Sequence, residues 1–441
     1  MRRSKFVVPF MALFLVMAAC TSDEDGGGDG GTGDGAAQEE DTGNVNVLSA
    51  LAAEEGEVLQ SLVDELITPN VEYQAEIEAS EQFEEQLQIR SEAGTLDIIL
   101  LPQPGAVQAQ AASGNAVSLE DLGFDIAELE TAFGEYFMSL GEFEGEHYGL
   151  PTNSNYKSLI WYPKAAFDAA GYQIPTTFDE LVALSDQIVA DGGTPWCAGF
   201  ESGTATGWPA TDWVEDIMLA TAGQDVYTQW VNHEIPFNDE SVATAVGMFG
   251  DIMFADGYVL GGAEQTPAIP FGDAPLPMFD DPPGCWLHRQ ATFINAFFPE
   301  GTEYGVDYDA FPFPTIDQQP ALFAGELAVA FRNSPEVVDF LERFSGEEMQ
   351  CAMAGDPGLS RLSPNTNVGA DCYSNPVLAD ASVQLTAALA GETVAGFDAS
   401  DQMPPEVGSG SFWTGMVEYL QQGPDSLQGI LDEIEASWPA E

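Results

Sequence analysis

Strand-like and helix-like segments alternate near the start of the chain. Residues 44–51, 71–77 and 96–101 are short and rich in apolar residues, as β-strands are. Between them, residues 54–68 and 81–91 place apolar side chains at helical spacing. Because the order β-α-β-α-β is typical of parallel strands joined by helices, it predicts an α/β fold in which helices cover a parallel sheet.

A second α/β region is predicted further along the chain. Residues 156–162 and 325–331 are strand-like. The segment Thr177-Phe178-Asp179-Glu180 has the form of a capping box, which begins a helix. Ser334-Pro335-Glu336 combines an N-cap residue with a proline at the first helical position. A length of 441 residues, 45% of them hydrophobic, suits two or three domains.

The charge balance excludes two classes of partner. The chain has 10 Lys and Arg against 73 Asp and Glu, and its formal net charge is -63. Such a surface repels a phosphate backbone, so we expect no nucleic-acid partner. A basic patch that would bind a membrane surface is excluded for the same reason.

The N-terminus reads as an export signal. A basic start is followed by an apolar run over residues 6–19, which is too short for a comfortable membrane span. The run ends in Met17-Ala18-Ala19-Cys20, which resembles a bacterial lipobox and implies that Cys20 is lipidated after removal of residues 1–20 as a signal peptide. An ordinary signal with an incidental cysteine is the alternative. Residues 21–43 are acidic and rich in Gly, and we expect a disordered tether.

The other cysteines fit an exported protein. Four cysteines in an oxidising compartment predict two disulfides, and they allow three pairings. The short loop between them favours Cys351 with Cys372, which leaves Cys197 with Cys285. No C-x-x-C spacing occurs and the three His residues show no metal-ligand spacing, so we expect neither a metal nor a cofactor.

Three segments place aromatic residues beside small polar ones in sequence that reads as irregular: 203–213, 282–290 and 408–415. A tryptophan covers the apolar face of a sugar ring with a rigid plane, while carboxylates, amides and Arg bind the hydroxyl groups. This combination favours a carbohydrate site. Packing in a hydrophobic core is the alternative for each tryptophan.

Several motifs in order resemble one known family. Tyr148-Gly149-Leu150-Pro151 leads to Leu159-Ile160-Trp161-Tyr162, then to 167–172 and 175–181, which read FDAAGY and PTTFDEL. Over about residues 45–440 the chain resembles the extracellular solute-binding proteins of carbohydrate ABC transporters, the maltose-binding-protein-like group. Its tryptophan motifs look most like the α-glucoside-binding subgroup.

The resemblance implies the type II periplasmic-binding-protein fold. In that fold two lobes, each a mostly parallel sheet flanked by helices, enclose a ligand cleft at a hinge. The chain crosses between the lobes, so the implied boundaries are 44–152 plus 324–360 for lobe 1 and 153–323 plus 361–441 for lobe 2. A ligand that contacts both lobes closes the hinge.

The resemblance also implies the ligand-binding residues. Trp286 and Trp413 match stacking tryptophans, and Glu55, with Glu54 as its rival, matches an acid that binds sugar hydroxyls. Gln103 is the substitute where the family often has an aromatic residue and an acid. The other candidates lie in the matching segments: Asn155, Lys157, Trp208, Asp212, Arg289 and Phe412. For Asp212 and Arg289, an ion pair is the alternative role.

We therefore expect a monomeric, lipid-anchored protein at the outer face of the cell membrane, or in the periplasm where an outer membrane exists. It would capture a sugar, an α-glucoside or another oligosaccharide, and deliver it to the permease subunits of an ABC importer without catalysis. Two alternatives stay open: an anchored extracellular glycosidase, and a protein of the same fold that binds a polyol or a non-sugar solute.

Overall fold

The structure is a computed structural model that describes residues 43–80, 82–373, 375–389 and 394–439. The predicted signal peptide, Cys20 and, apart from Gly43, the predicted tether lie outside the described residues. None of the helices in the described ranges is both long and apolar enough to cross a membrane.

The first three strands and two α-helices of the described chain follow the order that the sequence predicts. Its elements are β1 (Asn44–Ser49), α1 (Ala53–Leu66), β2 (Gln74–Ala79), α2 (Phe83–Ala93) and β3 (Ile98–Leu101). Strand β1 pairs in parallel with both β2 and β3. Every residue of β3 is buried, which is expected of a parallel strand covered on both faces.

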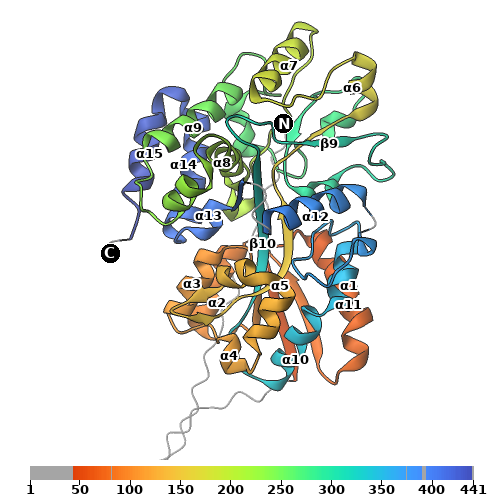
Figure 1. The fold of residues 1–441 in the computed structure, drawn as a ribbon, viewed down its shortest axis with the longest axis vertical. Helices are drawn as coiled ribbons and strands as arrows, with labels where there is room; N and C mark the ends of the chain where they lie inside the picture. Colours follow the sequence, from red (N-terminus) through yellow and green to blue (C-terminus); the bar gives the residue numbers. More distant parts are fainter. Residues whose placement is uncertain (1–42, 81, 374, 390–393, 440–441) are drawn as a thin grey trace, which may run out of the picture. The chain divides into compact units, whose positions relative to one another are not determined.

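Two long strands connect this sheet to the rest of the chain. β10 (Pro320–Ala330) is buried along all of its 11 residues and lies antiparallel to β6 (Leu150–Tyr156). One end of β10 pairs with β3 and the other with β11 (Val394–Phe397). Figure 1 shows β10 between the helices that surround its two ends. Gly325 at its middle is required, because a Cβ there would lie 2.3 Å from the carbonyl oxygen of Asn153.

A second group of elements packs around a separate small sheet. Its strands are β7 (Leu159–Tyr162), β8 (His288–Arg289) and β9 (Asp309–Pro312), and β7 pairs antiparallel with both β8 and β9. The expected parallel pairing therefore holds for β1–β3 and for β10 with β11, but not here. The predicted capping box is present, because the Oγ1 of Thr177 accepts the N–H of Glu180 and the carboxylate of Glu180 accepts the N–H of Thr177. It begins α7 (Phe178–Ala190).

The remaining elements complete both groups. The helices are α3 (Pro104–Ala112), α4 (Leu119–Leu122), α5 (Ile126–Leu140), α6 (Lys164–Ala170), α8 (Trp208–Val231), α9 (Glu240–Met253), α10 (Pro335–Phe344), α11 (Glu347–Gly355), α12 (Pro376–Leu389), α13 (Ala399–Gln402), α14 (Trp413–Gln422) and α15 (Leu427–Glu435). The short strands β4 (Glu142–Phe143) and β5 (Glu146–His147) form a hairpin. Short 3-10 turns include η2 (Gly203–Ala205), and a π-helical segment, η7 (Glu406–Phe412), precedes α14.

Two of the segments that read as irregular are largely helical. α8 begins at Trp208 and α14 at Trp413, so both tryptophans are first helical residues. Gly207 precedes α8 and Pro209 lies in its first turn, and both residue types are common at helix starts. Gly207 and Pro209 therefore mark a helix boundary, whereas Gly408 and Gly410 lie inside η7.

Both favoured cysteine pairings are confirmed. Cys197 is bonded to Cys285 and Cys351 to Cys372, with Cα atoms 5.4 and 5.1 Å apart.

His288, which contacts the backbone of Cys197 in the Cys197–Cys285 disulfide, makes the free energy of unfolding depend on pH. Its side chain is buried, Nδ1 lies 2.8 Å from the carbonyl oxygen of Cys197, and no described group partners Nε2. Burial lowers the pKa of His288 to about 4 from its usual 6.5. The unfolded chain therefore takes up this proton first, and the stabilisation present above pH 6.5 is lost as the pH falls toward 4.

Between pH 7 and pH 5.5, we expect the free energy of unfolding of the wild type to fall by about 1 kcal/mol more than that of His288→Phe. This value follows from a conversion of about 1.4 kcal/mol per pKa unit. Urea unfolding at both pH values measures the difference. Equal pH slopes for the two proteins would show that His288 titrates normally.

Candidate ligand-binding site

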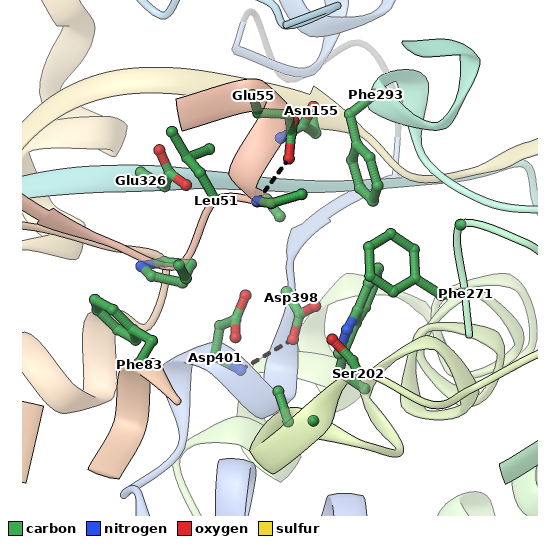
Figure 2. A pocket seen from close by; sticks show the side chains of 18 of the residues that line it. Leu51, Glu55, Phe83, Asn155, Ser202, Phe271, Phe293, Glu326, Asp398 and Asp401 are labelled. Atoms are coloured by element: carbon green, nitrogen blue, oxygen red, sulfur yellow. Dashed lines mark hydrogen bonds between the residues drawn. The ribbon is translucent and has the colours of Figure 1, made fainter. Parts of the chain in front are cut away.

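A cavity of about 400 Å³ lies beside the middle of β10, where Ala324, Gly325 and Glu326 form part of its wall. These residues fall between the stretch of β10 that pairs with β11 and the stretch that pairs with β3. The other walls come from segments far apart in the sequence. Figure 2 shows Glu55, Asn155 and Glu326 on one side of the cavity and Ser202, Asp398 and Asp401 on the opposite side.

Aromatic rings form a third wall. The ring of Trp208 lies 5.4 Å from that of Phe271 and 6.0 Å from that of Phe293, between centroids. Trp413 also lines the cavity and donates its indole N–H to the Oγ of Ser400 at 3.0 Å. Gly207 brings the two tryptophans together, because its φ is +115° and a Cβ there would lie 2.3 Å from the carbonyl oxygen of Trp413.

A buried ion network supports the wall beneath Trp208. The Nζ of Lys157 lies 2.9 Å from Asp212, contacts Asp398, and sits 5.0 Å from the Trp208 ring. Burial alone lowers the pKa of Lys157, but the carboxylates of Asp212 and Asp398 outweigh burial and raise this pKa well above its usual value. Lys157 is therefore a permanent cation that two acids hold in place.

Arg289 extends this network away from the cavity. Its Nη1 lies 2.9 Å from Asp212, and its Nε and Nη2 both bind Asp216. The side chains of Arg289, Asp212 and Asp216 are completely buried. Such a set is stable only because each charge has a partner of opposite sign.

A second cation lies on the opposite side of the cavity. Arg361 places Nη2 3.1 Å from Glu55 and Nη1 3.0 Å from Glu326. Glu55 is fixed further, because its Oε2 accepts the backbone N–H of Ala52 at the start of α1. The Nε of Arg361 is buried without a partner among the described residues. This side of the cavity thus offers a positioned guanidinium and two carboxylates.

The structure brings six of the ten predicted ligand-binding residues to the cavity: Glu55, Gln103, Asn155, Lys157, Trp208 and Trp413. Glu55 rather than its rival Glu54 lines the wall. Asp212 and Arg289 are not in the lining and take the alternative role, an ion pair behind Lys157.

Trp286 and Phe412 are corrections to the predicted site. Trp286 does not line the cavity; it packs edge-on against Tyr172, with ring centroids 5.1 Å apart. Its backbone N–H bonds to Pro195, beside the Cys197–Cys285 disulfide, which holds the segment in the second group of elements. Phe412 is buried in the core against Trp230. Sequence motifs locate such segments but not the direction in which each ring points.

Seven charged lining residues were missed: Glu84, Glu201, Asp273, Glu326, Arg361, Asp398 and Asp401. No local pattern distinguishes these acids among the 73 in the chain. The strand that contains Glu326 was predicted, and the burial of an acid in an otherwise apolar strand is the one signal that could have identified it.

Comparison with known proteins places the chain in a family. Residues 50–350 match the bacterial extracellular solute-binding proteins. The chain belongs to this family. Two relatives are similar over most of the chain. One is the osmoprotective compounds-binding protein GgtB of Synechocystis sp., 36% identical over 92% of this chain and 95% of its own length. The other is the alpha-glucosides-binding periplasmic protein AglE of Rhizobium meliloti, 38% identical over 82% and 79%.

Solved structures of solute-binding proteins confirm the two-lobed type II fold. The bacterial solute receptor AcbH superposes with a TM-score of 0.74 at 16% identity, over 89% of this chain and 97% of its own. Maltose-bound T. maritima MalE3 superposes with a TM-score of 0.67 at 16% identity, over 89% and 99%. At these identities the likeness describes the fold alone.

Proposed function

We propose that this solute-binding protein captures a neutral sugar, an α-glucoside or another oligosaccharide, in the cavity beside β10 and delivers it to an ABC importer. The observation that carries the proposal is the pairing of an aromatic wall with opposed polar sides. Trp208 and Trp413 offer apolar planes for a ring face, while Glu55 and Asn155 offer groups for hydroxyls. The alpha-glucosides-binding relative supports this ligand class.

The charges of the cavity support a ligand without negative charge. Seven acids line it against two basic residues, and acids hold both basic residues in ion pairs. An anionic solute would meet an excess of negative potential there, and so would bind poorly. The cavity volume of about 400 Å³ lies within the range of small-molecule sites.

We propose that β6 and β10 act as the hinge and that the lobes follow the boundaries 44–152 plus 324–360 and 153–323 plus 361–441. Contacts at the cavity mouth support a closed arrangement. The Oγ1 of Thr204 donates to Glu84 of α2 at 2.7 Å. A Cβ on Gly105 of α3 would lie 2.0 Å from the carbonyl oxygen of Met403, beside α13. Small-angle scattering with and without sugar would measure the closure.

We also propose that the protein binds its sugar without transforming it. The two acids beneath Trp208, Asp212 and Asp398, share the ammonium group of Lys157, which supports a holding role for this pair rather than the roles of an acid and a base. Release of product from labelled oligosaccharides at catalytic enzyme concentration would instead favour the glycosidase alternative.

Anchoring, oligomeric state and partner belong to the same proposal. A lipid on Cys20 would hold a monomer at the outer face of the membrane, within reach of the permease subunits. The lipobox-like segment Met17-Ala18-Ala19-Cys20 supports the anchor. Membrane fractionation of the full chain and of Cys20→Ala measures it.

A thermal-shift panel tests the proposed ligand class. We expect one of maltose, trehalose, sucrose, longer glucans or polyols to stabilise the protein by about 1.4 kcal/mol at tenfold excess over its Kd, because ligand binds only the folded state. A shift with a polyol alone would favour the polyol alternative. No shift with any compound at millimolar concentration would contradict sugar binding.

A further inference from the structure

Asp401 differs from the other buried acids of the cavity. It lies in α13, its side chain lines the cavity, and the residue is only 6% exposed. Its backbone N–H donates to Asp398 at 2.9 Å, but within the described residues no hydrogen bond or ion pair reaches its carboxyl group. By contrast, Glu55 and Glu326 bind Arg361, and Asp398 binds Lys157.

The surroundings hold the Asp401 backbone in place. Asp398 caps α13 by accepting the backbone N–H of Asp401 and the hydroxyl of Ser400 through the same oxygen. The buried carboxylate of Glu215 accepts the N–H groups of Ala399 and Ser400. The helix turn that presents Asp401 to the cavity is therefore fixed before any ligand arrives, which favours binding.

An unpartnered buried carboxyl group is unfavourable for the free protein. Burial, reinforced by the negative charge of Asp398, raises the pKa of Asp401 well above its usual range. Leaving a buried polar group without a partner destabilises the folded protein. Because each of the other buried lining acids has a cationic partner, the partner of Asp401 is expected to come from outside the chain.

We propose that Asp401 is a specificity-determining residue, whose carboxyl group accepts a hydrogen bond from a ligand hydroxyl facing α13. This inference rests on the proposed sugar-binding function. Figure 2 shows Asp401 across the cavity from Glu55 and Asn155, and Trp413 joins α13 through Ser400. A sugar bound between these two sides would therefore meet hydrogen-bond acceptors for its hydroxyl groups at opposite edges. The indole ring of Trp413 would lie beside the edge that faces Asp401.

Calorimetric titration with maltose, trehalose and sucrose tests the assignment on the full chain. We expect Asp401→Ala to bind the sugar preferred by the wild type at least tenfold more weakly, because the ligand hydroxyl is then buried without its acceptor. Asp401→Asn keeps a neutral acceptor and should fall between the two. Asp225→Ala is the matched control: Asp225 is exposed on α8 and does not line the cavity, so we expect less than a twofold change.

Monodeoxy analogues of that sugar separate direct contact from a structural role. One analogue should lose affinity for the wild type but not for Asp401→Ala, because the variant no longer binds the missing hydroxyl. Equal sugar affinity of Asp401→Ala and the wild type would overturn the role of Asp401, and so would the same deoxy penalties in both proteins. If the wild type binds none of the three sugars, nor any compound of the thermal-shift panel, the proposed function itself fails.

Discussion

Arg289→Met is expected to lower the free energy of unfolding by about 3–5 kcal/mol, the range for breaking a buried ion pair by removing one partner. The Arg289 side chain is completely buried, and it binds both Asp212 and Asp216. Methionine fills much of the volume but supplies no positive charge. Asp212 keeps Lys157, but Asp216 is left with the hydroxyl of Ser158 and without a cation.

Two further variants isolate the cause. Arg289→Met combined with Asp216→Asn should recover much of the loss, because the second change removes the uncompensated charge. Arg343→Met removes an exposed pair with Asp339 on α10 and should change stability by 0.5 kcal/mol or less, the usual value for such pairs. Urea unfolding of all three proteins gives the free energies. A loss below 1 kcal/mol for Arg289→Met would contradict the account of the network.

The parts of the fold that were predicted correctly depend on local chemistry. The β-α-β-α-β order and the Thr177 capping box follow from spacing and side-chain hydrogen bonds within a few residues. The start of β10 was missed, because Pro320 and Gly325 usually interrupt strands. Here the contact of Gly325 with the Asn153 backbone requires glycine, and only the paired strand β6 explains it.

The candidate site was predicted less completely than the fold. Glu55, Trp208 and Trp413 were found through the family resemblance, and the structure places them at one cavity. Asp401 was missed, because its special property is that no residue in the described part of the chain partners its carboxyl group, and no sequence pattern records that. Trp286 was misplaced, because the motif locates its segment beside Cys285 but does not indicate that the ring packs against Tyr172.

The two tryptophans provide the second large prediction. Trp208→Ala should weaken binding of the preferred sugar by at least about 2 kcal/mol, or about 30-fold, because it removes a ring from the centre of the aromatic wall. Lys157 would also lose the ring that lies 5.0 Å from its ammonium group. We expect this large loss of affinity because Trp208 lies in the cavity wall, and not simply because it is a tryptophan.

Trp286→Ala is the matched control, since it removes the same side chain from a place where it contacts Tyr172 rather than the cavity. The most direct test of the central claim, that the aromatic wall beside β10 holds a sugar, is calorimetric titration of both variants with the sugar that stabilises the wild type. The account predicts a loss of about 30-fold for Trp208→Ala and less than twofold for Trp286→Ala. Wild-type affinity in Trp208→Ala, or a larger loss in Trp286→Ala, would contradict it.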